Sequence, residues 1–471
     1  MKKQKSVVFT CSSCGHEEPK WLGRCPECGE WNTLTETALS GRGTVKAHAS
    51  VSGNGGSALP QSWPLSAIDS QEGSRIPSGI GELDRVLGGG IMKRSTILVG
   101  GEPGIGKSTL LLQAAAAAET RGRILYVSGE ESPGQVKMRA DRLGIKGDRI
   151  ELCCSGRLED IMTILEAVKP VIIMVDSIQT VHTDEAGIMP GTVNQMKYCS
   201  YELISWVKEH DAALFLVAHV TKDGVIAGPK TLEHMVDTVL YFEQNDGDSR
   251  FLRGAKNRFG SVDEIGIFTM DERGLTMEAD PSLLFLVRRD GALPPGIATA
   301  AVLEGSRALL VEIQALTIPA KGAMSRVFSD CIDSARVSRI AATLEKHLNL
   351  RLSDHDLYVN VAGGIRIAEV GVELALACAL YSARIGRSLP VRTAIAGEVS
   401  LAGEVRSVKR LPGRIKTSRS LGFETFLGPR ADTPDPHERR SGTHAATPDT
   451  SRAEASIAVR DINSAIKFLF S

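Results

Sequence analysis

The most informative stretch of this sequence is Gly101-Glu102-Pro103-Gly104-Ile105-Gly106-Lys107-Ser108-Thr109. It satisfies G-x-x-x-x-G-K-[ST], the pattern of a phosphate-binding loop. An apolar run at 95–100 predicts a buried strand before it, and a run rich in leucine and alanine from 110 predicts a helix after it. Backbone amides and the helix N-terminus then favour an anion. We therefore expect an ATP site in which Lys107 neutralises the β and γ phosphates and Ser108 ligates Mg²⁺.

Three further apolar runs alternate with helical stretches downstream of the loop, at 124–127, 171–176 and 213–219. Continuous apolar strands separated by helices indicate a parallel sheet with both faces covered, so the predicted class is α/β. Ligands of such sheets bind at the carboxyl ends of the strands. Residues 67–280 are therefore expected to form a phosphate-loop ATPase core.

Polar residues end these apolar runs where a nucleotide would bind. Asp176 is the predicted Mg²⁺ ligand, directly or through water, although it could instead cap the next helix. Glu130 is the preferred carboxylate for polarising the attacking water, with Glu131 as a solvated neighbour. His219 could sense the γ-phosphate or have only a structural role.

The length and composition of the 471-residue chain limit its domain number and its class of partner only broadly. The length allows two or three domains, and the apolar fraction of 42% is enough for ordinary cores. A net charge of −1 means that any DNA contact must come from locally clustered basic residues. No run of 18 apolar residues occurs, and no apolar segment follows the basic N-terminus. We expect a cytoplasmic protein without a membrane partner.

The N-terminal 34 residues contain two C-x-x-C pairs, Cys11 with Cys14 and Cys25 with Cys28. Four thiolates fit tetrahedral Zn²⁺ and leave no open position, so a structural zinc finger is predicted. A redox pair and an iron–sulfur site are the alternatives.

Aromatic and basic residues lie between the cysteines of this segment. Trp21, Arg24 and Trp31 could form a contact face for nucleic acid or protein, or the tryptophans could simply cover the small domain. Residues 35–66 lose apolar periodicity and are expected to form a flexible linker.

The segment Lys256-Asn257-Arg258-Phe259-Gly260 is the KNRFG motif, and through it the chain resembles the RadA family of bacterial DNA repair proteins. Other stretches that resemble this family are the four cysteines and residues 83–91, 101–109, 128–132 and 218–224. The match covers nearly the whole chain in the same order. The resemblance implies a core similar to RecA and to replicative hexameric helicases.

Activity and partners are also implied by this resemblance. The implied activity is DNA-stimulated ATP hydrolysis in repair and homologous recombination, with branch migration alongside the RecA recombinase. The implied partners are single-stranded and branched DNA and further copies of the chain, assembled into a hexameric ring. The cofactors are ATP, Mg²⁺ and Zn²⁺.

The two cations of the KNRFG motif suggest a role between subunits. Lys256 and Arg258 could act on a neighbour's γ-phosphate, as an arginine finger supplied in trans does. A basic surface turn and phosphate contacts to DNA are the alternatives. Loops at 183–194 and 222–234 follow predicted strands on the nucleotide side. Lys222 and Lys230 are the preferred contacts to the DNA backbone, although ordinary solvated loops are nearly as good an interpretation.

Residues 285–471 resemble the proteolytic domain of Lon, which uses a Ser-Lys dyad. The serine position falls at about Gly371 and the lysine position near Pro412, so we expect a Lon-like α+β domain without protease activity. Oligomerisation and DNA binding are its expected roles. The DNA contacts would come from a basic run, or this run is only a solvated helix face. The run comprises Arg406, Lys409, Arg410, Arg414, Lys416 and Arg419. Residues 430–456 are predicted to be a disordered insertion.

The main hypothesis is therefore a DNA repair ATPase of the RadA type. An ATP-dependent protease is the first alternative, against which the missing serine and lysine argue. The second is a non-enzymatic, nucleotide-gated scaffold of the RecA superfamily.

Overall fold

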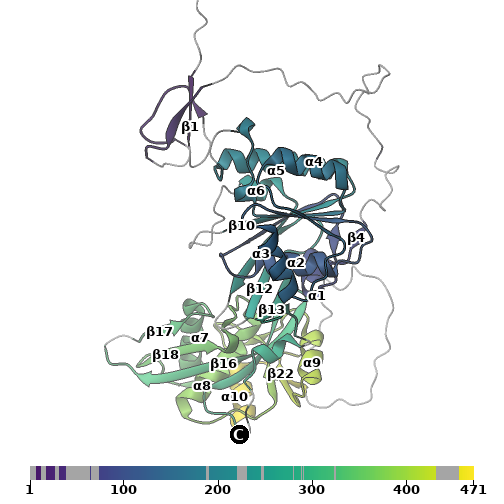
Figure 1. Ribbon diagram of the computed structural model, residues 1–471. Helices are drawn as coiled ribbons and strands as arrows, with labels where there is room; N and C mark the ends of the chain where they lie inside the picture. Colours follow the sequence, from purple (N-terminus) through teal and green to yellow (C-terminus); the bar gives the residue numbers. More distant parts are fainter. Residues whose placement is uncertain are drawn as a thin grey trace, which may run out of the picture. The chain divides into compact units, whose positions relative to one another are not determined.

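The computed structural model describes residues 7–11, 17–26, 31–38, 64, 74–186, 190–219, 231–244, 249–278, 280–287, 289, 291–322, 325–430 and 456–471 (Figure 1). The chain divides into two compact units. The first comprises residues 1–243, 254–260 and 272–275, and the second 244–253, 261–271 and 276–471. Most of the predicted linker and of the predicted 430–456 insertion lies outside the described residues.

Strands near the N-terminus form a small antiparallel sheet in the order β2-β1-β3. The strands are β1 (Val7–Cys11), β2 (Glu17–Glu18) and β3 (Leu34–Ala38). Cys11, Cys25 and Leu34 are buried together, with Phe9 packed against them. This cluster of described residues is small and buries little apolar surface, which makes a bound metal the natural source of folding energy.

Six parallel strands carry the core of the first unit, in the order β11-β6-β10-β9-β7-β8. The strands are β6 (Thr96–Gly101), β7 (Ile124–Ser128), β8 (Ile150–Cys153), β9 (Ile172–Asp176), β10 (Ala213–His219) and β11 (Thr238–Gln244). The side chains of β6 and β7 are buried along their whole length. The prediction of a parallel sheet in an α/β fold is therefore confirmed.

Helices cover both faces of this sheet, with α4 and α5 over one face and α2 and α3 over the other (Figure 1). The helices are α1 (Gly81–Leu87), α2 (Lys107–Ala117), α3 (Pro133–Arg142), α4 (Leu158–Val168), α5 (Val193–Glu209) and α6 (Thr231–Met235). Ser132 and Gln135 form a capping box at the start of α3, and Thr192 caps α5. By contrast, no side chain caps α2.

Strand β12 (Ser249–Asn257) belongs in part to each unit. Its residues Ser249 to Arg253 pair antiparallel with β13 (Ile265–Asp271), and the short β14 (Gly274–Thr276) follows. The KNRFG motif begins at the end of β12.

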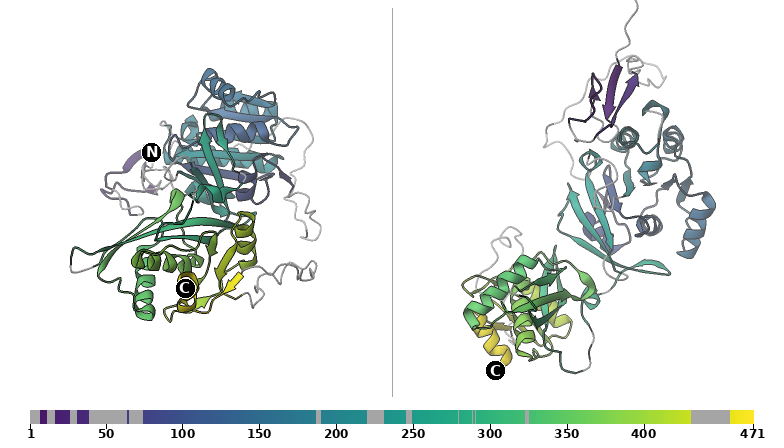
Figure 2. Two further views of the ribbon diagram at one scale, coloured as in Figure 1. Left: turned by 90° about the horizontal axis from the view of Figure 1, so that it is seen from below. Right: turned by 90° about the vertical axis from the view of Figure 1, so that its left-hand side faces the viewer.

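The second unit is built on a seven-stranded sheet in the order β17-β18-β16-β15-β19-β22-β23. The strands are β15 (Ile297–Glu304), β16 (Arg307–Pro319), β17 (Val327–Ser329), β18 (His355–Val361), β19 (Thr393–Ile395), β22 (Thr425–Gly428) and β23 (Ser456–Ala458). Helices α7 (Ser334–Leu348), α8 (Glu373–Ile385) and α10 (Ile462–Phe470) share one core with this sheet (Figures 1 and 2). Helix α9 (Leu411–Ser420) contributes to a separate cluster.

Arg414 on α9 is completely buried, so its assignment to the DNA-binding run is wrong. Its guanidinium donates to both carboxylate oxygens of Glu369, at 2.8 and 3.0 Å, and to the Ala301 carbonyl at 2.6 Å. A charge is buried only when it is paired and hydrogen-bonded, and this pair satisfies that requirement. The other five basic residues of the run are exposed.

The Glu369–Arg414 pair also occupies the space beside Gly371, at about which the resemblance to Lon places the serine. A Cβ at Gly371 would lie 2.5 Å from Glu369 Oε1 and 2.9 Å from Arg414 Nη1, so a serine does not fit without rearrangement. Pro412 lies in the first turn of α9. Neither Gly371 nor Pro412 therefore offers a side chain of the expected Ser-Lys dyad.

None of the helices in the described part of the chain is both long and apolar enough to cross a membrane.

Candidate nucleotide-binding site

The phosphate loop connects β6 to α2 and presents an open helix N-terminus. Gly106 lies at the helix start with φ 114°, a left-handed conformation that suits glycine. Because no side chain caps the helix, its first-turn amides are available to an anion. Gly101 must also be small, since a Cβ there would lie 2.7 Å from the Phe242 carbonyl oxygen.

Lys107 is folded into the loop and is only 4% exposed. Its ammonium donates to the carbonyl oxygens of Gly101 at 2.7 Å and Glu102 at 2.8 Å. Burial lowers the pKa of Lys107 to about 8, although the carboxylates of Asp176, Glu130 and Glu102 act in the opposite direction. A phosphate would supply the counter-charge that this lysine lacks.

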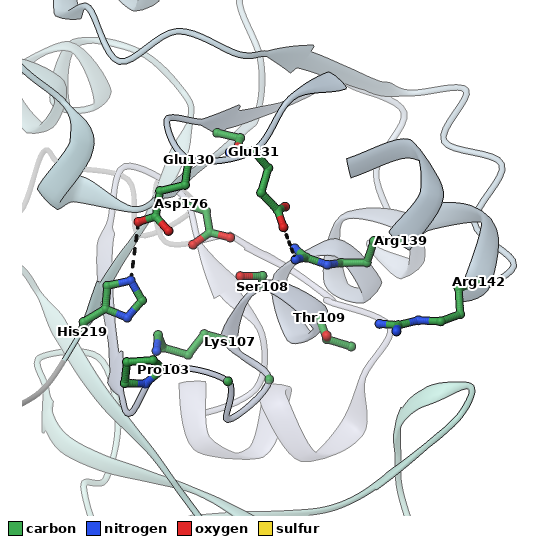
Figure 3. Close-up of a pocket in the computed structure, with 13 residues that line it drawn as sticks. Pro103, Lys107, Ser108, Thr109, Glu130, Glu131, Arg139, Arg142, Asp176 and His219 are labelled. Carbon is green, nitrogen blue, oxygen red and sulfur yellow. Dashed lines mark hydrogen bonds and ion pairs between the residues drawn. The ribbon is translucent and has the colours of Figure 1, made fainter. Parts of the chain in front are cut away.

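The loop borders a cavity of about 320 Å³ at the carboxyl edge of the parallel sheet (Figure 3). The cavity brings together Lys107, Ser108, Glu130, Asp176 and His219. Strand register produces this convergence, because Ser128 pairs with Asp176 across β7 and β9, and Gly101 pairs with His219 across β6 and β10. The other residues of its lining are Pro103, Gly104, Gly106, Thr109, Ser128, Glu131, Arg139 and Arg142.

Asp176 is held in place by a residue that sequence reasoning missed. The phenol of Tyr126, on the neighbouring β7, donates to Asp176 Oδ2 at 2.7 Å. Tyr126 is completely buried, and burial together with the Asp176 charge raises its pKa well above the usual value. The phenol therefore stays protonated and orients the carboxylate. The sequence carries one signal for this contact, because Tyr126 is the single phenol in the otherwise aliphatic run at 124–127.

The two neighbouring glutamates have different surroundings. Glu130 Oε1 accepts a hydrogen bond from the Ser177 hydroxyl at 2.7 Å and lies 3.5 Å from His219 Nε2. Glu131 instead pairs with Arg139 of α3. The interpretation of Glu131 as a solvated neighbour is therefore wrong, because its carboxylate is already engaged. This difference leaves Glu130 as the better candidate base.

Lys256 and Arg258 do not line this cavity. The Lys256 ammonium donates to the carbonyl oxygens of Glu233 at 2.7 Å and Val236 at 2.6 Å. Arg258 lies 3.2 Å from the Asp237 carboxylate and has a side chain that is 58% exposed. Burial and the neighbouring Arg258 charge lower the pKa of Lys256. Both cations therefore lie on a surface of the first unit that is separate from its own nucleotide cavity.

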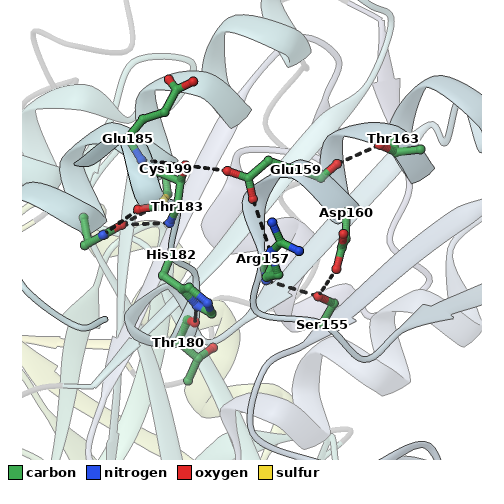
Figure 4. Close-up of polar contacts among 11 residues, drawn as sticks. Ser155, Arg157, Glu159, Asp160, Thr163, Thr180, His182, Thr183, Glu185 and Cys199 are labelled. Carbon is green, nitrogen blue, oxygen red and sulfur yellow. Dashed lines mark hydrogen bonds and ion pairs between the residues drawn. The ribbon is translucent and has the colours of Figure 1, made fainter. Parts of the chain in front are cut away.

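The loop that follows β9 is anchored at its start (Figure 4). The Thr183 amide donates to Gln195 Oε1 at 3.0 Å, and the Gln195 amide returns a bond to the Thr183 carbonyl at 2.8 Å. The Thr183 hydroxyl donates to Glu159 of α4 at 2.5 Å. Residues 190–194 are described as well, whereas Lys222 and Lys230 lie outside the described residues.

The zinc prediction can be examined at two of its four cysteines. Cys11 and Cys25 are 2% and 1% exposed and lie in the same small cluster, as ligands of one buried metal must. Cys14 and Cys28 lie outside the described residues. The two visible thiols therefore fit a structural zinc site.

Comparisons with known proteins agree with this architecture. A family model described as a rubredoxin metal binding domain, the zinc ribbon of LapB, matches residues 9–36, and a KaiC ATPase model matches residues 76–155. A protein of Treponema pallidum named DNA repair protein RadA is 56% identical over 451 residues, covering 95% of this chain and 98% of its own length. A Bacillus subtilis protein of the same name is 43% identical, with coverages of 92% and 94%. The ATPase fold and the N-terminal zinc ribbon are thereby confirmed.

The lowered pKa of Lys107 predicts that nucleotide binding takes up a proton. In the free protein this lysine loses its charge as the pH rises through about 8. The bound phosphates favour the charged form and are themselves ionised at this pH. Calorimetric titration with ADP at pH 8.5, in two buffers of different ionisation enthalpy, should therefore show proton uptake. Affinity should fall as the pH rises further. At pH 6.5, where Lys107 is charged in both states, no uptake is expected, and buffer-independent heats at pH 8.5 would contradict the assignment.

The phenol on Asp176 generates a second prediction. Tyr126→Phe should raise the Mg²⁺ concentration needed for half-maximal ATP hydrolysis by about tenfold, because a hydrogen bond to a metal-ligating carboxylate fixes its orientation. Nucleotide binding without Mg²⁺ should change little. Tyr241→Phe is the matched control, since that phenol donates to Glu233 outside the cavity. An unaltered Mg²⁺ titration in Tyr126→Phe would show that the phenol does not position Asp176.

Proposed function

Because the chain belongs to the RadA family of DNA repair proteins, we propose that it is a DNA-stimulated ATPase that processes recombination intermediates. It would bind single-stranded and branched DNA and promote branch migration alongside a RecA recombinase. The observation that carries the proposal is the cavity at the carboxyl edge of the sheet. There a buried lysine, an open helix N-terminus and two carboxylates converge.

The residues of the cavity have separate proposed roles in ATP hydrolysis. Lys107 and the first-turn amides of α2 would bind the phosphates. Ser108 and Asp176 line the same cavity, and an oxygen pair of this kind fits Mg²⁺. When bound, Mg²⁺ would neutralise charge on the phosphate oxygens. Tyr126 keeps Asp176 oriented toward this role.

Glu130 is the proposed base that accepts a proton from the attacking water. Ser177 and His219 hold its carboxylate from two sides, while 49% of the side chain remains open to solvent and substrate. His219 lies between this carboxylate and the phosphate loop, since it pairs in register with Gly101. It could therefore report the state of the γ-phosphate to Glu130.

Lys256 and Arg258 are proposed to complete the site of a neighbouring subunit in a homo-oligomeric, hexameric ring. Their position outside the cavity of their own chain and the exposure of Arg258 support this role. A finger supplied in trans stabilises charge on the phosphates during hydrolysis. Such an arrangement would make ATP turnover depend on assembly.

Further parts of the proposal rest on the resemblance and on charge. Cys14 and Cys28 would complete the zinc site, and Lys222 and Lys230 would contact the DNA backbone. The five exposed basic residues around α9 would add phosphate contacts in the second unit. The steric conflict at Gly371 argues against the alternative of an ATP-dependent protease.

The proposed function is tested by measuring ATP hydrolysis with and without single-stranded DNA. We expect DNA to raise the rate about fivefold or more, as coupled ligands commonly do. Lys107→Ala should lower the rate about 100-fold under both conditions. Lys137→Ala, whose exposed side chain pairs with Asp141, is the control and should retain full activity. Nucleotide binding with negligible turnover and no response to DNA would instead support the scaffold alternative.

Subunit mixing tests the proposed finger. Lys107→Ala and Arg258→Ala should each be nearly inactive. An equal mixture should regain roughly a quarter of the wild-type rate, because about one interface in four pairs an intact loop with an intact finger. Mixing Lys107→Ala with Lys107/Arg258→Ala should restore nothing. If the first mixture also stays inactive although hybrid oligomers form, Arg258 acts within its own subunit or not at all.

A further inference from the structure

Two indole rings on the N-terminal module are turned away from its small core. Trp21 is 55% exposed and Trp31 is 69% exposed, and Leu22 between them in the sequence is exposed as well. The buried cluster of this module, among its described residues, consists of Cys11, Cys25 and Leu34. This exposure favours a contact face over the alternative that the tryptophans simply cover the small domain. Two of the four tryptophans of the chain stand on this surface.

Backbone pairing places the two rings together. Arg24 and Trp31 form an antiparallel bridge, and the Asn32 amide donates to the Gly23 carbonyl at 2.8 Å. A Cβ built on Gly23 would lie 3.7 Å from Cη2 of Trp21 and 3.8 Å from Cζ3 of Trp31. Both indoles therefore lie beside the same backbone position, in an arrangement that the paired segments hold in place.

Positive charge borders these rings. Lys20 and Arg24 are exposed on either side of Trp21 and Leu22 in the sequence. The Arg24 guanidinium lies over the Trp31 ring, 5.9 Å from its centroid. Flat aromatic faces beside cations match a ligand that alternates flat rings with anions, and single-stranded nucleic acid has this chemistry.

We propose that Trp21, Trp31 and Arg24 form a base-stacking platform for single-stranded DNA, with Lys20 and Arg24 contacting the flanking phosphates. The platform rests on the proposed DNA-linked function and gives the zinc module a part in it. The metal would support the platform from below, since Cys25 directly follows Arg24. Such a contact would bind DNA without base-sequence preference, because every base has a face that can stack.

Matched oligonucleotides separate stacking from charge. Binding of the full-length chain to a dT oligonucleotide is compared with binding to an abasic oligonucleotide of equal length and charge. The wild type should bind dT about tenfold more tightly, and its tryptophan fluorescence should be quenched only by dT. Trp21→Ala/Trp31→Ala should lose this preference while retaining its zinc content. Trp21→Phe/Trp31→Phe should largely keep it, because a phenyl ring still stacks.

Tyr201→Ala is the control variant, since it removes an aromatic side chain that is 61% exposed on α5, outside the module. It should bind both oligonucleotides as the wild type does. Equal wild-type affinity for dT and abasic DNA overturns the platform and leaves the proposed function standing. The same conclusion follows if the alanine variant keeps its DNA affinity but loses association with a partner protein. A wild type that binds neither oligonucleotide removes the DNA-linked function and the platform with it.

Discussion

The register of the parallel sheet is the constraint on which the nucleotide site depends. Pairing of β7 with β9 sets Ser128 beside Asp176, and pairing of β6 with β10 sets Gly101 beside His219. These strands are apolar and buried along nearly all of their length, so a shift in register would carry polar ends into the core. The packing of the sheet thereby aligns the carboxyl ends of four strands, and the polar residues that follow them converge on one cavity.

Hydrogen bonds from neutral groups hold the charged residues of this cavity before any nucleotide binds. Tyr126 donates to Asp176, and Ser177 donates to Glu130. Since these hydroxyls are themselves buried, each carboxylate is oriented by a group that has little freedom to move. Such preorganisation is valuable in hydrolysis, because the groups need not reorganise as charge develops on the phosphates. Lys107 differs from these carboxylates. The two carbonyl oxygens that accept its hydrogen bonds offset the cost of burying its charge less well than an anion would.

The second unit shows how one buried ion pair can restrict the residues beside it. The serine expected from the resemblance to Lon falls at about Gly371, and the volume beside this glycine contains the Glu369–Arg414 pair. Arg414 has no exposed surface, and a buried guanidinium left without its carboxylate would be strongly unfavourable. The pair therefore has a structural role, and its buried guanidinium is not accessible to DNA.

The features that could be predicted from the sequence depend on local chemistry. The phosphate loop, the apolar strands and the strand-end position of Asp176 follow from glycine geometry and from apolar periodicity, which need no partner from elsewhere in the chain. Contacts between residues far apart in the chain could not be predicted, because they form only on folding. Tyr126 reaches Asp176 across 50 positions, Glu131 meets Arg139 of the next helix, and Arg414 turns inward to Glu369. A basic residue looks alike in sequence whether it faces solvent or a buried carboxylate, because the partner that decides its environment is brought to it only by folding.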